Sequence, residues 1–228
     1  FYEMCVIDPK FARAHREGDI HIHDMDFYTL TTTCCQIDLR RLFKGGFSTG
    51  HGVLREPNDI ASYSALACIA IQSNQNDQHG GQSVPNFDYG MAPGVRKSFV
   101  KLYYRNMGKL LEGLCGIDEG GLVAREICKD IEEKYGVVPQ MGWNNNYLQL
   151  EAEALEEYVS AEDIAKMQDM ARKFTDREIR RKTYQAMEAL IHNLNTMHSR
   201  AGAQVPFSSL NYGTDTSPEG RLVMECIM

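Results

Sequence analysis

The 228-residue chain lacks several features that would place it in a common class of protein. No apolar run approaches the ~20 residues that a membrane-spanning helix needs. The first residues, FYEMCVIDPK, have no basic stretch followed by an apolar core, so they do not form a secretory signal. The formal net charge is −7, which gives no general basic field for nucleic acid. These absences predict a globular protein that binds neither membranes nor nucleic acids.

The seven cysteines also lack a pattern, because none of them forms a CxxC pair and their number is odd. This argues against a secreted disulfide framework and against a four-cysteine zinc ribbon. We therefore expect a cytoplasmic protein with free thiols. Four of these cysteines are expected to be buried as small apolar side chains: Cys68, Cys115, Cys128 and Cys226.

An initiator methionine is missing, and the last residues, RLVMECIM, have the pattern of a helix that continues. The chain is therefore expected to be one domain, residues 1–228, of a longer protein.

The apolar periodicity predicts an α/β fold with an excess of helix. Strands are expected within residues 19–39 and 203–213, and a polar loop over 78–94. Helices are expected over 9–17, with Asp8 as N-cap, and over 57–75, 95–114, 121–135 and 160–199, and from Pro218, with Ser217 as N-cap. A possible capping box, Thr175 and Glu178, would start a second helix inside 160–199.

Two short stretches carry candidate chemistry, GDIHIHD and TTTCCQIDL. If GDIHIHD is a strand, His21 and His23 point to the same face, and Asp24 follows them. Imidazole and carboxylate suit zinc and similar metals, so a metal-dependent hydrolase barrel is one alternative. Two hydrogen-bonded structural histidines are an equally simple alternative.

In TTTCCQIDL the vicinal pair Cys34 and Cys35 would point to opposite faces of a strand. The two thiols therefore cannot both enter one site. At most one of them takes part in chemistry, and the other is expected to be a packing residue.

The segment TSPEGR presents free helix amides beside hydroxyl groups, which suits an anion, although an ordinary capped helix has the same sequence. The amide-rich stretch SNQNDQHGGQS could recognise base edges or sugar hydroxyls, or it could be a helix end that leads into a polar loop.

Taken together and in this order, six strings resemble the large chain of the anaerobic (class III) ribonucleoside-triphosphate reductase family. They are GDIHIHDMDFY, TTTCCQIDL, GFSTGHGVLREP, IQSNQNDQHGGQSVPNFDY, MAPGV and HSRAGAQVPFSSLNYGTDTSPEGR. The resemblance implies a ten-stranded α/β barrel and the reduction of ribonucleoside triphosphates to deoxyribonucleotides for DNA replication, by radical chemistry without oxygen.

The resemblance also implies roles for particular residues. One cysteine of the vicinal pair would take part in the reduction, and Cys35 is favoured over Cys34 because it is in phase with Ile37 and Leu39. The resemblance also places His21, His23 and Asp24 on the substrate side. Separately, the free helix amides, the hydroxyl groups and the positive charge predict that Ser208, Ser209, Thr216, Ser217 and Arg221 hold the substrate's phosphates. The implied effector and dimer region contains Gln75, Gln78, His79, Gly80, Gly81 and Gln82.

The family's other parts are not seen in this sequence. The radical-bearing glycine, a structural zinc site, the thiyl cysteine and an ATP-binding regulatory domain are expected in the full-length enzyme. No metal or other cofactor is expected within residues 1–228, and this piece alone is expected to be inactive. The implied partners are a ribonucleoside triphosphate, deoxynucleotide and ATP effectors, a radical-SAM activase and a second copy of the chain.

Overall fold

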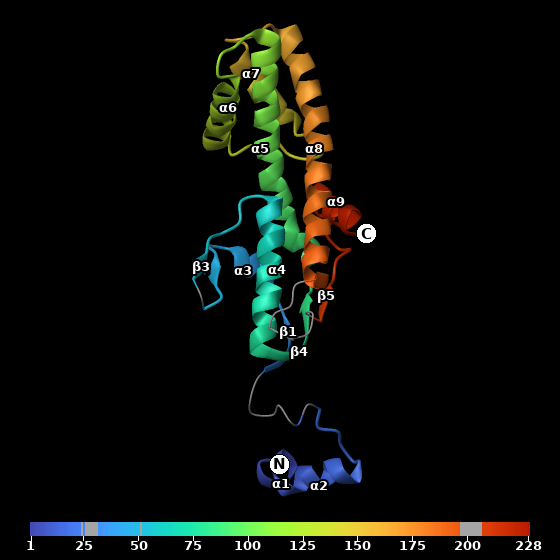
Figure 1. The fold of residues 1–228 in the computed structure, drawn as a ribbon. Helices are drawn as coiled ribbons and strands as arrows, with labels where there is room; N and C mark the ends of the chain where they lie inside the picture. Colours follow the sequence, from blue (N-terminus) through green and yellow to red (C-terminus); the bar gives the residue numbers. More distant parts are fainter. Residues whose placement is uncertain (24, 26–31, 51, 197–206) are drawn as a thin grey trace.

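The computed structural model describes residues 1–23, 25, 32–50, 52–196 and 207–228 (Figure 1). The helices are α1 (Tyr2–Cys5), α2 (Pro9–Glu17), α3 (Leu39–Phe43), α4 (Ile60–Asp77), α5 (Phe87–Cys115), α6 (Gly120–Tyr135), α7 (Asn145–Leu155), α8 (Ala161–Thr196) and α9 (Pro218–Ile227). The strands are β1 (Thr32–Gln36), β2 (Phe47–Ser48), β3 (Val53–Leu54), β4 (Gln78–Val84) and β5 (Ser208–Leu210). The fold is therefore helix-rich α/β, as predicted. No helix in these ranges is long and apolar enough to cross a membrane.

A small parallel sheet contains the strand that carries Cys34 and Cys35. Its strands have the order β1-β4-β5, and β4 pairs in parallel with both neighbours. The crossover from β1 to β4 includes α4, and the crossover from β4 to β5 includes the long helices α5 and α8. The short strands β2 and β3 form a separate antiparallel pair.

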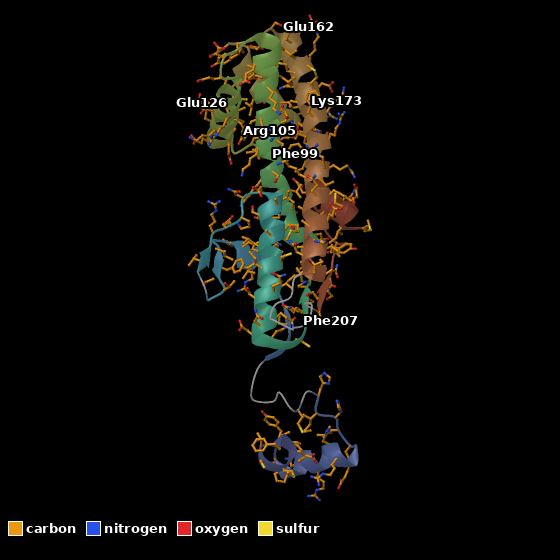
Figure 2. The ribbon with its side chains drawn as sticks, in the orientation of Figure 1. Phe99, Arg105, Glu126, Glu162, Lys173 and Phe207 are labelled. Carbon is orange, nitrogen blue, oxygen red and sulfur yellow. The ribbon has the colours of Figure 1, made fainter. Side chains whose placement is uncertain are left out.

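The helices α5 and α8 run side by side in the upper part of Figure 1, and α1 and α2 lie well below them. Figure 2 shows that side chains from both helices fill the space between them. At the sheet end they share an apolar core with α4 and α9, in which Phe99 and Met187 are almost fully buried. At the other end they form a second core with α6 and α7 around Met107 and Met167. One helix pair thus serves two cores.

The predicted helix starts are confirmed where a capping side chain is present. Asp8 accepts a hydrogen bond from the Lys10 backbone N–H before α2, and Ser217 accepts one from Gly220 before α9. The helix expected over 57–75 is α4, which begins three residues later than Pro57. Asp59 and Ser62 form a reciprocal capping box there, which fixes the start at Ile60.

The polar loop predicted over 78–94 is wrong. Residues 78–84 form the central strand of the sheet, and α5 begins at Phe87 and continues through Pro93. Glycine and proline suggested a loop, but β4 obtains backbone hydrogen bonds from two neighbouring strands, which local sequence does not reveal. Gly94 permits close helix packing, because a Cβ there would come within 2.7 Å of the Tyr63 ring.

The helix break predicted at Thr175 is also wrong, because α8 is continuous from Ala161 to Thr196. Thr175 is fully buried, and its hydroxyl donates to the Ala171 carbonyl at 2.7 Å instead of capping a new helix. It also accepts a hydrogen bond from Asn106 of α5. A threonine that satisfies its hydroxyl within the helix does not end it.

The strand predicted for GDIHIHD is not found in its described residues. Gly18 ends α2 in the left-handed conformation, and residues 19–23 are turn and irregular structure. The strand begins later, at Thr32. The argument that His21 and His23 share a strand face therefore fails.

A buried carboxylate lies in the second core. Glu151 of α7 is 3% exposed and accepts hydrogen bonds from Tyr103 of α5 at 2.6 Å, Gln168 of α8 at 2.9 Å and Tyr147 at 3.2 Å. Burial raises the pKa of Glu151 to about 7, although these hydrogen bonds favour the ionised form. Besides the two tyrosines, the buried thiol of Cys128 on α6 is the titratable group beside this cluster.

This arrangement predicts a stability that depends on pH. A carboxyl group with a raised folded-state pKa is protonated more readily in the folded chain than in the unfolded one. Stability is therefore full at acidic pH near 4.5, falls as pH rises and is lowest above about 7. The loss is on the order of 3 kcal/mol for this group.

Glu151→Gln should remove most of this dependence, so its melting temperature should change less between mildly acidic and alkaline pH than that of the parent. Glu153→Gln, an exposed change on the same helix, is the control and should follow the parent curve. The prediction would be contradicted if the melting temperatures of Glu151→Gln and of the parent changed by the same amount across this pH range.

Candidate functional site

The sheet has one face against the helices and one face away from them. Ile37, Val84 and Leu210 pack on the first core, so their face is the covered one. Because side chains alternate along a strand, Cys35, Gln82 and Ser208 lie on that face too, and the register places these three in one row.

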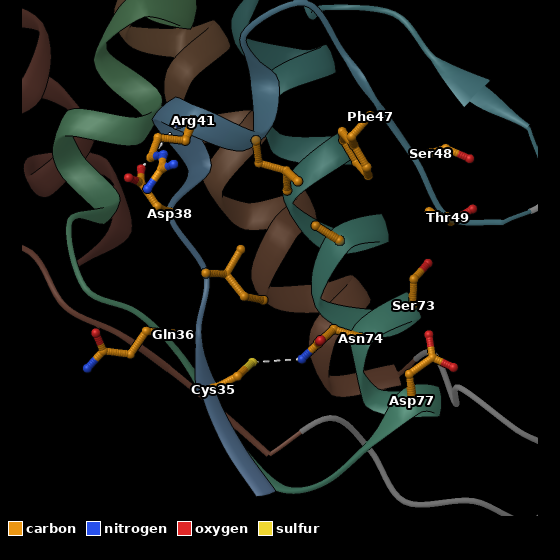
Figure 3. Close-up of a pocket in the computed structure, with 13 residues that line it drawn as sticks. Cys35, Gln36, Asp38, Arg41, Phe47, Ser48, Thr49, Ser73, Asn74 and Asp77 are labelled. Atoms are coloured by element: carbon orange, nitrogen blue, oxygen red, sulfur yellow. Dashed lines mark hydrogen bonds between the residues drawn. The ribbon is translucent and has the colours of Figure 1, made fainter. Parts of the chain in front are cut away.

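Cys35 is part of a polar network on the covered face. Asn74 of α4 directs its side-chain nitrogen at the Cys35 sulfur, 2.8 Å away, as Figure 3 shows. The same nitrogen lies 2.7 Å from the Gln82 side-chain oxygen. Gln82 is 3% exposed and donates to the Ile71 carbonyl at 2.9 Å and to Gln75 at 3.0 Å. These bonds fasten α4 to the sheet.

A cavity of about 680 Å³ opens beside Cys35 (Figure 3). It lies between the end of β1, α3, β2 and α4, and its polar lining includes Asp38, Arg41, Ser73, Asn74 and Asp77. The volume suits a small ligand. Neither Asn74 nor this cavity was predicted as a site, although Asn74 belongs to the amide-rich stretch that the sequence singled out.

Cys34 has a different environment. It is exposed and has a φ of 46°, which is unusual for a residue with a side chain. The register with β4 shifts at this point, and the extra residue of β4 falls at Gly80 and Gly81. A Cβ on Gly80 would lie 3.0 Å from the Cys34 sulfur, so glycine there leaves room for the thiol.

Of the remaining cysteines, Cys5 is exposed, and the other four were predicted to be buried packing residues. Cys68, Cys128 and Cys226 are buried as predicted, whereas Cys115 is only half-buried. Burial raises the pKa of Cys68 and of Cys128 to about 11, so these thiols stay protonated at neutral pH.

The loop between β5 and α9 is held by a buried carboxylate. Asp88 of α5 is fully buried, and one of its oxygens accepts from the backbone N–H groups of Gly213, Thr214 and Asp215 at 2.9–3.0 Å. Burial alone would raise the pKa of Asp88, but the backbone donors, including Tyr89, outweigh it and lower the pKa. No local signal identified Asp88, because its partners lie 125–127 residues later.

The first turn of α9 is largely satisfied by its own residues. The Ser217 hydroxyl accepts from Gly220 at 3.1 Å, and the Ser217 N–H donates to Asp215 at 2.8 Å. Glu219 is buried and pairs with Arg96. Thr216 and Arg221 are exposed, as is Ser209 on β5, whereas Ser208 is half-buried. Of the side chains predicted to bind phosphate, Ser209, Thr216 and Arg221 are therefore accessible to a ligand.

The predicted histidines, His21 and His23, lie near the start of the chain, far in sequence from the loop before α9. The His21 ring is 5.5 Å from the His15 ring and 5.8 Å from the His23 ring, between centroids. Asp24 lies outside the described residues. Within the described ranges no group of three or more His, Cys, Asp and Glu gathers in a way that would hold a metal.

The predicted effector region is not a loop, since Gln78 to Gln82 belong to β4. Gln78 is 8% exposed, and its side-chain nitrogen donates to the carbonyls of Gly80 and Gly81. Its side-chain oxygen has no hydrogen-bond partner among the described atoms. The side chain of His79 lies outside the described part.

Comparison with known proteins assigns the chain to a family. The family model for anaerobic ribonucleoside-triphosphate reductase matches residues 1–228. The protein of that name from Enterobacteria phage T4 is 23% identical over 223 residues, which cover 96% of this chain and 27% of the phage protein. The Escherichia coli (strain K12) protein of that name is 25% identical over 219 residues, which cover 95% of this chain and 23% of that protein.

The chain spans about a quarter of the length of these curated relatives. The family model nevertheless covers every residue. The chain therefore belongs to the anaerobic ribonucleoside-triphosphate reductase family.

Proposed function

We propose that the chain forms part of the catalytic domain of an enzyme that reduces ribonucleoside triphosphates to deoxyribonucleoside triphosphates. The observation that carries the proposal is the exposed thiol of Cys34 on a parallel sheet, within a chain that the family model matches throughout. The alternative, a metal-dependent hydrolase using His21 and His23, has no support, because the relatives are named as reductases and the strand that would align the histidines is not found.

We assign the reduction step to Cys34 and a packing role to Cys35. The phase with Ile37 that favoured Cys35 puts it on the face covered by helices, where Asn74 and α4 lie against it. Cys34 is exposed, and Gln36 and Ser209 are exposed on neighbouring positions of the sheet. A thiol in that position donates a hydrogen atom to the substrate, and the electron donor, formate or a thiol system, then restores it.

The open face of the sheet suits a barrel interior. In α/β barrels the helices lie outside and the opposite faces of the strands point inward. The three parallel strands would therefore be part of the ten-stranded barrel, with the remaining strands supplied by the rest of the protein. The radical glycine and the structural zinc site belong to that remaining part too, and the glycyl radical would supply the oxidising power that starts the reaction.

For the substrate's phosphates we propose the exposed groups after β5. Arg221 supplies a positive charge in a chain of net charge −7, and Ser209 and Thr216 supply hydroxyl donors. Ser217 contributes indirectly, because its hydroxyl caps α9. Asp88 already occupies the amides of residues 213–215, so its role is to fix the loop. Roles for His21, His23 and Asp24 in binding substrate hydroxyls remain part of the proposal.

Regulation would involve a deoxynucleotide effector at a dimer interface near α4 and the start of β4. The buried oxygen of Gln78 that lacks a partner among described atoms supports a polar ligand there. An ATP effector and a radical-SAM activase would act on the full-length homodimer. The seven free thiols suit the reducing cytoplasm.

The assignment of the vicinal pair is tested in the full-length enzyme by Cys34→Ser and Cys35→Ser. Cys34→Ser should abolish deoxynucleotide formation while the glycyl radical stays detectable by electron paramagnetic resonance. Cys35→Ser should retain turnover and lose on the order of 1 kcal/mol of stability. Turnover that survives in Cys34→Ser but disappears in Cys35→Ser would reverse the assignment, and activity in both variants would exclude the pair from the reduction.

The phosphate assignment is tested by Arg221→Ala and Ser217→Ala. Arg221→Ala should raise the substrate KM several-fold at an unchanged melting temperature, since the exposed guanidinium makes no described ion pair. Ser217→Ala should lower stability by about 1 kcal/mol through loss of the cap. Arg125→Ala, an exposed arginine on α6, is the control. A normal substrate KM for Arg221→Ala would refute the assignment.

A further inference from the structure

A groove of about 350 Å³ lies between α6 and α7, the two helices that cover the second core. On α6 it is lined by Val123, Glu126, Ile127 and Asp130, which have the spacing i, i+3, i+4 and i+7. From Leu150 onward, the lining residues of α7 and of the turn after it follow the same spacing. Residues at this spacing share one side of a helix, so each helix presents a continuous face to the groove.

The floor of the groove is apolar. Val123, Ile127 and Leu150 pack against the second core but are only partly buried. Two tyrosines also line the groove: Tyr135 at the end of α6 is 59% exposed, and Tyr158 after α7 is 49% exposed. Aromatic side chains are enriched at protein interfaces, where they act as anchors. The floor therefore offers apolar and aromatic surface to side chains of another protein.

The rim of the groove is acidic. Glu126 and Asp130 line it from α6, Glu153 and Glu157 line it from the other side, and all four are exposed. Figure 2 shows Glu126 on α6 at the outer edge of the molecule. The one cation in the lining, Lys134, lies 3.6 Å from Asp130, and the three glutamates form no ion pair with any described residue. Because four carboxylates face one ammonium group, cations of a partner would relieve the repulsion between them.

We propose that this groove binds a basic amphipathic helix of another protein, with its apolar side chains on the floor and its lysines or arginines on the acidic rim. A helix that docks in an apolar groove presents anchors at i, i+3, i+4 and i+7, which matches the spacing of the two helix faces here. The negative rim would repel an acidic segment or an anionic surface. The groove contains neither Cys34 nor Cys35, so docking here is independent of the proposed reduction.

The test uses the full-length protein and a fluorescein-labelled synthetic helix that carries leucine on one face and lysine on the other. Fluorescence anisotropy should show binding that weakens at high salt, because exposed charges are screened. The same helix with glutamate in place of lysine should not bind. A scrambled peptide of the same composition has no apolar face, so it should bind roughly tenfold more weakly or worse.

Substitutions in the groove separate its two contributions. The double variant Glu126→Gln with Glu153→Gln should weaken binding of the leucine–lysine helix roughly fivefold, as loss of two exposed ion pairs would do. Tyr158→Ser should weaken it as well, because it removes an aromatic ring from the apolar surface. The charge-matched control, Glu132→Gln with Glu188→Gln, changes two exposed glutamates outside the groove and should leave the affinity unchanged.

Three results would overturn the proposal. The Glu126→Gln, Glu153→Gln variant could bind the helix as the parent does, or the scrambled peptide could bind equally well, in which case charge attraction alone explains the binding. The full-length protein could fail to bind the helix, which would mean that the rest of the polypeptide covers the groove. A changed oligomeric state of the double variant in analytical ultracentrifugation would assign the groove to a second copy of the chain instead.

Discussion

The packing of α5 against α8 is the constraint on which the rest of the structure depends. The first helix contributes Phe99 and Leu102 to one core and Met107 and Leu111 to the other. The second contributes Met187 to the first core and Met167 to the second. Every other helix of the two cores packs against this pair. Since the pair also lies in the crossover between β4 and β5, its position determines where the last strand joins the sheet.

Buried carboxylates complete the arrangement in two different ways. Asp88 is surrounded by backbone N–H donors, so its ionised form is favoured, and it fixes the loop that leads into α9. Glu151 has side-chain donors from other helices but no cation among its described partners, so burial dominates and raises its pKa to about 7. Asp88 therefore stays ionised and holds its loop at neutral pH, whereas the contribution of Glu151 to the free energy of unfolding changes with pH.

The two neighbouring cysteines have different surroundings on one sheet. Cys35 shares the face of Ile37 and is held by Asn74, while Cys34 is exposed at the point where the pairing with β4 shifts. Gly80, opposite Cys34, has the positive φ of 90° that this irregular pairing requires. Gly80 and Gly81 made this segment resemble a loop in the sequence. In the structure, the absence of a side chain at Gly80 leaves room for the Cys34 thiol.

The sequence by itself determined the features that depend on near neighbours and on a distinctive set of motifs. Asp8 and Ser217 marked helix starts because a cap acts within three residues, and the ordered strings identified the family. Tertiary structure decided the rest. Only the neighbouring strands made residues 78–84 a strand, and only the packing of α4 on the sheet made the exposure of Cys35 differ from that of Cys34. Asp88 acquired its role from amides more than a hundred residues away, since a buried charge is stabilised by whatever donors the fold brings to it and not by its neighbours in sequence.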